Sequence, residues 1–143
     1  MPHPKAQRCP CCGYAAVIPS ARPGRVVRYR NAALNLPADL RLPACQRCKY
    51  EPLGLDTLPP ELLESLYRDN LQERVAVAIA RLKGVRSQRR TELLVNLSQG
   101  YLSRLQAGHG VPGAPLVSLL ALLAAHPQLI GELEDYWTLP PGA

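Results

Sequence analysis

The sequence predicts an α+β protein of more than one domain, in which a small β module precedes an all-helical part. Three observations predict this organisation. Residues 1–51 hold all five cysteines without helical periodicity, residues 52–60 (PLGLDTLPP) combine three prolines with a glycine, and residues 61–143 carry apolar residues at helical spacing. We therefore expect an N-terminal domain over 1–51, a linker over 52–60 and a helical domain over 61–143.

Short extended runs suit the N-terminal part better than helices do. Ala15–Ile18, Arg25–Arg30 and Leu40–Leu42 are candidate strands, and the second of these has the β-branched and aromatic content that strands favour. Seven prolines are spread over the first 51 residues and would interrupt any helix there. We see no internal repeat in the chain.

Four of the five cysteines form two CxxC pairs, separated by 32 residues. The four are Cys9, Cys12, Cys45 and Cys48. Two residues between cysteines make a tight turn that directs both sulfurs to one metal, and backbone N–H groups in the turn can stabilise the thiolates. Gly13 stands where a positive φ is often required. The spacing predicts one structural zinc in a closed four-thiolate site, as in zinc ribbons, and leaves Cys11 over.

Other uses of these cysteines fit the sequence less well. Four core cysteines without metal would leave a Pro-rich segment of about 50 residues with too little core. A redox CxxC would be expected beside a βαβ pattern, which is missing here. A catalytic zinc would need an open coordination position and nearby acid–base groups, whereas His3 is the one histidine close by. No signal peptide is recognisable at the N-terminus, so we expect a reducing, bacterial cytoplasm.

The helical part should begin at Pro59-Pro60-Glu61 with a short helix that runs to about Asn70. Apolar residues then follow at i, i+4, i+7, i+8 and i+11, which places them on one helix face that ends at Gly84. These residues are Leu71, Val75, Ala78, Ile79 and Leu82.

Two short helices separated by a turn should come next. Ser87 can cap a helix over 88–95, and Asn96 suits the turn because asparagine tolerates a left-handed backbone. Ser98 can cap a helix over 99–107, which Gly108 would end. The layout is that of a helix-turn-helix, and the predicted fold is a zinc-ribbon-like module followed by an all-helical domain of this kind.

Two apolar helices complete the expected domain. The first carries a leucine stripe wide enough for core packing and for a dimer contact, formed by Leu116, Leu119, Leu120 and Leu123 and widened by Val117 and Leu122. Pro127 starts the last helix, whose inward residues should be Leu129, Ile130, Leu133, Tyr136 and Trp137.

The helix over 99–107 has two chemically different sides. Tyr101, Leu102 and Leu105 cluster on one side, and small or polar residues form the other. Glutamine can bond bidentately to adenine and arginine to guanine, and a nearby run of arginines can fix phosphates. The predicted DNA-binding residues are Arg86, Gln88, Arg89, Arg90, Gln99, Gly100, Ser103 and Arg104. The alternative is an ordinary helical bundle with a solvated basic surface.

The charge distribution supplies a second hypothesis for DNA binding. The chain has a net charge of +6, and residues 1–51 hold nine lysines and arginines against Asp39 and Glu51. A basic surface of this kind suits nucleic acid or an acidic protein, with solubility alone as the bland alternative. DNA contact would then move to the N-terminal part, through Arg22, Arg25, Arg28 and Arg30.

Two other classes of function find little support. The longest apolar stretch, Leu116–Ala125, is much shorter than the ~20 residues that a membrane helix needs, so no membrane partner is expected. The chain shows no Ser/His/Asp set, carboxylate pair or phosphate loop, which argues against an enzyme.

Four segments together resemble the MqsA-type antitoxins, within the wider group of Xre-like helix-turn-helix regulators. They are CPCCG, CQRC, SQGYLSRLQAG and AAHPQLIGEL, in the order found in that family. The resemblance implies an N-terminal zinc domain that contacts a toxin. It also implies a five-helix C-terminal domain that dimerises, binds palindromic operators and represses its own operon.

The same resemblance assigns positions on the recognition helix. Arg104 matches the arginine that reads bases, and Gly100 stands where the antitoxin has a base-reading asparagine. Gln99 is placed to substitute for it, so the operator must differ. Thr91 and Glu92 depart from the small or apolar residues usual in the preceding helix. The predicted function is a homodimeric, zinc-stabilised repressor of double-stranded DNA, and the alternative is a protein-binding antitoxin that mainly masks a toxin.

Overall fold

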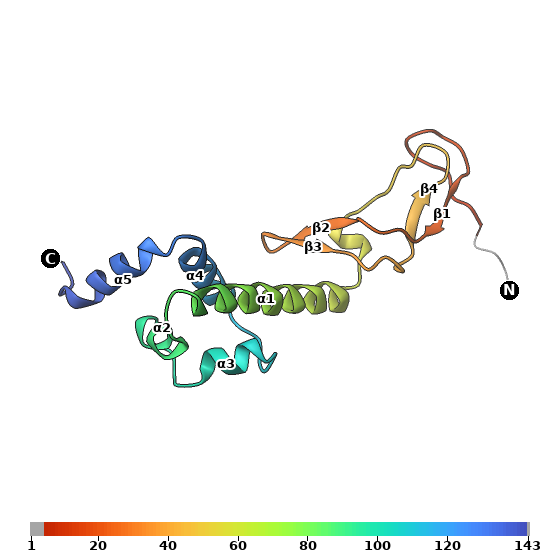
Figure 1. Ribbon diagram of the computed structural model, residues 1–143. Coiled ribbons are helices and arrows are strands. Elements are labelled where there is room, and N and C mark those ends of the chain that lie inside the picture. The colour runs from red at the N-terminus through yellow and green to blue at the C-terminus, as the bar shows by residue number, and fades with distance from the viewer. Residues whose placement is uncertain (1–4, 143) are drawn as a thin grey trace. The chain divides into compact units, whose positions relative to one another are not determined.

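The computed structural model describes residues 5–142, which form four short strands, a 3₁₀ turn and five α-helices (Figure 1). The elements are β1 (Val17–Ser20), β2 (Val26–Tyr29), β3 (Ala32–Asn35), β4 (Leu42–Cys45), η1 (Leu55–Thr57), α1 (Pro60–Lys83), α2 (Gln88–Leu94), α3 (Tyr101–Gln106), α4 (Ala114–Ala125) and α5 (Gln128–Thr138). The predicted α+β order, with the β part first and five helices after it, is confirmed.

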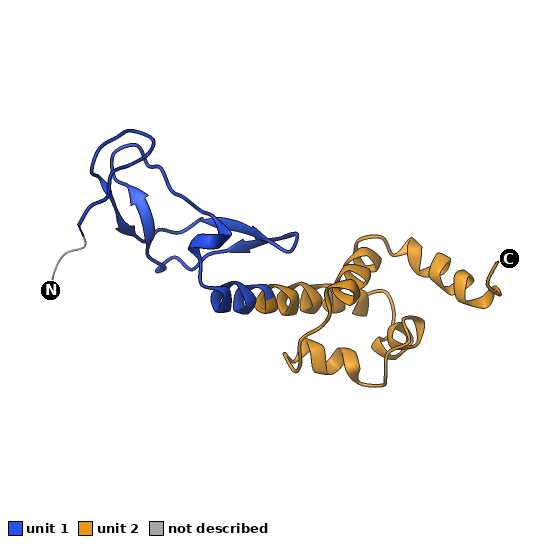
Figure 2. Ribbon diagram, turned by 180° about the vertical axis from the view of Figure 1, so that it is seen from behind, with its two compact units in different colours: residues 1–67 blue, residues 68–143 orange. Residues whose placement is uncertain are grey.

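The chain divides into two compact units (Figure 2). Unit 1 extends to Tyr67 and unit 2 begins at Arg68, so the division falls within α1. The segment expected as a linker, residues 52–60, lies in unit 1. It contains η1 and contributes the buried side chain of Leu58.

Unit 1 contains two separate two-stranded antiparallel sheets. β1 pairs with β4, which places Val17 opposite Cys45. β2 and β3 form a hairpin around Arg30 and Asn31, whose φ angles of 47° and 65° are both left-handed. Two such residues in succession suit the tightest hairpin turns, and Asn31 tolerates this backbone better than most residues. β3 lacks β-branched and aromatic residues and was not predicted from the sequence.

The β2–β3 hairpin and the first turns of α1 share one hydrophobic core. Its buried members are Val27, Leu34, Leu36, Leu42, Leu58 and Leu63, with Tyr29 and Tyr67 packed against them. The Tyr29 hydroxyl donates to Glu64, and Arg30 forms an ion pair of 2.8 Å with the same carboxylate. A second, smaller cluster contains Cys9, Val17 and Cys45.

α1 is one continuous helix, so the expected end near Asn70 is wrong. No glycine or proline interrupts residues 61–83, and the Asn70 side chain accepts a hydrogen bond of 2.7 Å from Arg74 one turn later. The predicted apolar face is confirmed in unit 2, where all five of its residues are buried. They are Leu71, Val75, Ala78, Ile79 and Leu82.

Three of the predicted end signals of α2 and α3 are confirmed. Ser87 caps α2 by accepting a hydrogen bond from the Arg90 N–H, Asn96 has a φ of 57°, and Gly108 follows α3 with a φ of 83°. The predicted cap by Ser98 is wrong. α3 begins at Tyr101, and Gly100 takes the cap position with a φ of 82° and no side-chain cap of its own.

α4 buries Val117, Leu120 and Leu123 of the predicted stripe, whereas Leu116 and Leu119 are half-buried and Leu122 is exposed. α5 buries Ile130, whereas Tyr136 and Trp137 are 66% and 58% exposed. Their expected inward placement is therefore wrong. Within residues 5–142, no helix combines the length and apolar character needed to cross a bilayer.

Candidate functional site

The four cysteines of the two CxxC pairs come together in unit 1. Their sulfurs all lie within 4.8 Å of one another. The closest pairs join the two turns: Cys9 Sγ lies 3.5 Å from Cys48 Sγ, and Cys12 Sγ lies 3.6 Å from Cys45 Sγ. Disulfide sulfurs would be about 2.0 Å apart, so these contacts are not disulfides. Cys11 is exposed and stands outside the cluster.

The two cysteine turns are built on the same hydrogen-bond pattern. In the first, the Gly13 N–H donates to the Cys9 carbonyl and the Cys9 N–H donates to the Tyr14 carbonyl, at 2.9 and 2.8 Å. In the second, Lys49 and Tyr50 take the places of Gly13 and Tyr14, at 3.0 and 2.8 Å. The expectation of no internal repeat is therefore incomplete. The motif CxxCxY occurs twice, and aligning the two pairs would have found it.

Backbone N–H groups stabilise thiolates in both turns, as predicted. The Cys11 N–H lies 3.3 Å from Cys9 Sγ, and the Cys48 N–H lies 3.5 Å from Cys45 Sγ. The Cys48 N–H, aided by that of Arg47 and opposed by burial, lowers the pKa of Cys45 from 9.0 to about 6. Burial opposes ionisation of Cys9, but the N–H groups of Cys12 and Cys11 outweigh it and lower its pKa.

The pKa values of the other two thiols shift in the opposite direction. The Tyr50 N–H favours the Cys48 thiolate, yet desolvation and the neighbouring sulfurs together raise the pKa of Cys48 to about 12. The Tyr14 N–H acts in the same way on Cys12, whose pKa is nevertheless raised by burial and by the sulfurs of Cys45 and Cys9. Four crowded thiols cannot all ionise unless a cation compensates their charge.

The donor set fits one metal ion. Four sulfurs at about 2.3 Å from a central zinc would be about 3.8 Å apart, close to the two shortest separations here. Cys9 and Cys45 are buried, and the remaining two thiols close the cluster from the solvent side. All four ligand positions come from protein, so the arrangement can hold an ion but offers no open position for a substrate.

Fewer basic residues of unit 1 are free to contact a ligand than their number suggests. Arg25 is 2% exposed, and its guanidinium donates to the carbonyls of Ser20, Pro37 and Leu40. Arg22 is paired with Glu51, and Arg30 with Glu64. Of the four arginines proposed as an alternative DNA contact, Arg28 alone is exposed without an ion pair among the described residues.

In unit 2, α3 separates its apolar and polar residues as predicted. Leu102 and Leu105 are buried, at 1% and 4% exposure. Gln99, in the turn before α3, and Ser103 and Arg104 on the helix are exposed. Gly100 is half-buried and also lies before the helix. The polar side of α3 therefore faces solvent and is not packed into the interior of unit 2.

A chain of polar contacts joins α1, α2 and α3. The Ser103 hydroxyl donates to Gln88 Oε1 at 2.9 Å, and Gln88 Nε2 donates to Gln106 Oε1 at 3.4 Å. Lys83 Nζ donates to the same oxygen of Gln106 at 2.5 Å. Gln88 and Ser103 therefore bond to each other. Of the residues predicted to read bases, Gln99 and Arg104 make no side-chain hydrogen bond in the described part of unit 2.

The three arginines predicted to bind phosphate differ in their exposure and in their ion pairs. Arg86 is paired with Glu134, and its side chain is only 16% exposed. Arg89 lies 3.8 Å from Glu92. Arg90 is exposed, and no ion pair of its side chain occurs within residues 5–142. Of the three, Arg90 is thus the one whose guanidinium has no ion pair in the described part of the chain.

The sequence marked Glu92 as unusual in this region but did not reveal its role. Glu92 is 2% exposed on α2, and its carboxylate accepts hydrogen bonds from the backbone N–H groups of Gly100 and Leu102. The available signal was that an acidic residue stands where small or apolar residues are usual in such a helix.

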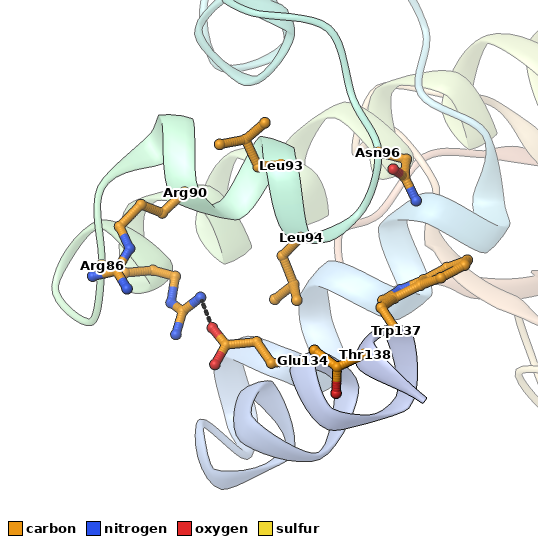
Figure 3. A pocket seen from close by; sticks show the side chains of 8 residues that line it. All are labelled: Arg86, Arg90, Leu93, Leu94, Asn96, Glu134, Trp137 and Thr138. Carbon is orange, nitrogen blue, oxygen red and sulfur yellow. Dashed lines mark hydrogen bonds and ion pairs between the residues drawn. The ribbon is translucent and has the colours of Figure 1, made fainter. Parts of the chain in front are cut away.

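An open groove of about 590 Å³ lies between α2 and α5 (Figure 3). Its lining residues are Arg86, Arg90, Leu93, Leu94, Asn96, Glu134, Trp137 and Thr138. The Arg86–Glu134 ion pair crosses one side, and Leu94 and Trp137 supply apolar surface (Figure 3).

No protein-family model, curated protein or solved structure matches this chain.

Proposed function

We propose that the chain is a sequence-specific DNA-binding regulator in which α2 and α3 form a helix-turn-helix and α3 enters the major groove. The observation that supports this most is the division of α3 into two sides. Leu102 and Leu105 are buried, whereas Ser103 and Arg104 are exposed beside the exposed Gln99. A recognition helix needs such an anchored side and a free side.

The free residues carry the chemistry of base reading. Arg104 can bond the O6 and N7 atoms of guanine, and Gln99 the N6 and N7 atoms of adenine. Ser103 keeps acceptor capacity while its hydroxyl donates to Gln88. Arg90 would contact phosphate and fix the register of the helix on the duplex.

The four-cysteine cluster is proposed to bind one zinc with a structural role. When bound, zinc would compensate the charge of the thiolates and cross-link the turn at Cys9 to the turn at Cys45. Unit 1 has small apolar clusters, so such a cross-link would add substantially to its stability. The absence of an open ligand position argues for this role over zinc catalysis.

The resemblance to MqsA-type antitoxins motivates narrower proposals. The protein would act as a homodimer on a palindromic operator, repress its own operon in the bacterial cytoplasm, and bind a toxin. A homodimer places two copies of α3 on one face of DNA, about one helical turn apart. Sedimentation equilibrium tests the dimer, and co-purification of the product of an adjacent gene tests the toxin.

DNA binding is tested by selection from a library of random duplexes with the zinc-loaded full chain. The proposal expects enrichment of a shared motif and binding at least 10³-fold tighter to that motif than to a scrambled duplex at the same salt concentration. Binding without preference between the two duplexes, or no binding at low salt, would refute sequence-specific recognition.

A further inference from the structure

The start of α3 is held by a side chain from α2 instead of by a residue of its own turn. Glu92 Oε1 accepts from the Gly100 N–H at 3.2 Å, and Glu92 Oε2 accepts from the Leu102 N–H at 3.0 Å. Both carboxylate oxygens are thus used on the first N–H groups of α3, which would otherwise lack acceptors. The Glu92 side chain is 3% exposed, so water cannot easily replace it.

The backbone of Glu92 contributes a third contact. Its carbonyl accepts from the Leu97 N–H at 2.8 Å, within the turn between the two helices. A single residue of α2 therefore contacts the beginning, the middle and the end of the segment from Leu97 to Leu102. Three hydrogen bonds from one buried residue restrict the position of this segment, and two of them are strengthened by the charge of the carboxylate.

Besides Glu92, the buried Leu102 and the hydrogen bond from Ser103 to Gln88 hold the first turn of α3. It contains six residues, and its cap residue Gly100 has no side chain and a φ of 82°. Ser98, the nearest hydroxyl, is exposed and its carbonyl receives the Tyr101 N–H at 3.2 Å. A helix this short depends on tertiary contacts for its stability and its direction.

We propose that Glu92 is a positioning residue that sets the angle of α3 against α2, and through it the ability of the protein to discriminate between DNA sequences. This inference rests on the proposed function. Gln99 and Arg104 flank the N–H groups that Glu92 binds, so a rotation of the first turn would move both side chains. Bidentate base contacts depend on geometry and would weaken, whereas phosphate contacts tolerate such a shift.

The charge of Glu92 gives the proposal a distinctive signature. A carboxylate at the N-terminus of α3 offsets the positive end of the helix dipole and repels phosphate. Removing it should therefore leave non-specific affinity equal or higher, while affinity for the selected motif falls. A purely electrostatic role would raise both affinities together, and a purely stabilising role would change neither once the protein is folded.

The experiment compares Glu92→Ala and Glu92→Gln with the native full chain, all zinc-loaded. Glu73→Gln is the matched control, because it removes an exposed acid of α1 in the same unit. Fluorescence anisotropy measures the affinity for the selected duplex and for a scrambled duplex. We expect Glu92→Ala to reduce the ratio of the two affinities about tenfold, comparable to the loss of one base contact. Glu73→Gln should leave the ratio unchanged.

If Glu92→Ala destabilises unit 2, Glu92→Gln serves in its place, because it keeps the shape of the side chain. Its carbonyl oxygen can still accept one hydrogen bond, but its NH₂ group would face the other N–H, so an intermediate ratio is expected. An unchanged ratio in folded Glu92→Gln and Glu92→Ala, or a parallel rise of both affinities, would overturn the proposal.

Amide hydrogen exchange separates this inference from the proposed function. We expect the Gly100 and Leu102 amides to exchange faster in Glu92→Ala, and residual dipolar couplings to report a new angle between α2 and α3. Unchanged couplings would overturn the positioning role even if the native chain binds DNA. If the native chain prefers no duplex, the proposed function is refuted, whereas the measured angle between α2 and α3 still shows whether Glu92 positions α3.

Discussion

Gly13 and Lys49 occupy the same place in the two cysteine turns. Each follows the second cysteine of its pair, each donates its N–H to the carbonyl of the first, and each has a left-handed backbone, with φ angles of 77° and 65°. Glycine adopts this conformation at little cost, whereas lysine is strained there by its Cβ atom. The second turn therefore carries a strain that the first avoids.

Lys49→Gly should stabilise the protein by about 1 kcal/mol, because it removes this strain and loses only an exposed hydrogen bond from Lys49 to the Gln46 carbonyl. Urea unfolding of the zinc-loaded protein measures the change. Gly13→Ala is the matched opposite: its added Cβ would meet no atom within 4 Å, so the expected loss of ~1–2 kcal/mol comes from the backbone alone. A lower midpoint for Lys49→Gly would contradict this explanation.

Cys9→Ser and Cys11→Ser should have very different effects on zinc binding and on the folding of unit 1, although the two cysteines are only two positions apart. Cys9 is buried in the cluster, whereas Cys11 is exposed outside it. We expect Cys9→Ser to lose stoichiometric zinc and to unfold much of unit 1, and Cys11→Ser to retain both. Metal analysis of the purified proteins and circular dichroism provide the measurements. Full zinc content in Cys9→Ser would show that the ion is bound elsewhere.

Zinc binding should weaken as the pH falls, because protons compete with the metal for thiolates. Cys45 has its pKa lowered from 9.0 to about 6, so ionisation of this thiol favours the folded state above pH 9 and ceases to do so as the pH falls through about 6. We expect zinc release to a chromogenic chelator to increase as the pH falls. Release that does not depend on pH would argue against thiolate ligands.

Arg25→Ala should destabilise unit 1 far more than Arg28→Ala, although the two arginines are close in sequence. The buried Arg25 guanidinium donates hydrogen bonds to the carbonyls of Ser20, Pro37 and Leu40, which would lose this donor in Arg25→Ala. A loss of about 2–4 kcal/mol is expected, against less than about 0.5 kcal/mol for the exposed Arg28. Equal effects of the two substitutions on thermal unfolding would show that the Arg25 contacts contribute little.

Local signals in the sequence predicted much of this structure. Spacing alone identified the four clustered cysteines, helical periodicity identified the buried face of α1 from Leu71 to Leu82, and the cap at Ser87 follows from residue type. The cap, the helix face and each CxxC pair depend on residues close together in sequence, where chain geometry determines which side chains meet. The two pairs are 32 residues apart, and their meeting was predicted because four thiolates complete one metal site.

Features that depend on tertiary contacts escaped prediction. β3 contains Ala32 and Asn35 and forms because the hairpin turn brings it against β2. Glu92 caps a helix that begins nine positions later, at Tyr101, which no local capping rule anticipates. Tyr136 and Trp137 follow the helical spacing of an apolar stripe that includes the buried Ile130, but they are exposed. Periodicity shows which residues share a face and not whether another element covers it.

The affinity of Arg104→Ala for the selected duplex tests the central claim most directly. Arg104 is exposed on α3, and Arg68 on α1 offers a control substitution of the same charge in the same unit. We expect Arg104→Ala to cost ~1–3 kcal/mol on the selected duplex, with a relaxed preference at one base pair, and Arg68→Ala to change affinity little. Native affinity in a folded Arg104→Ala protein would contradict the assignment of α3 as the element that reads DNA.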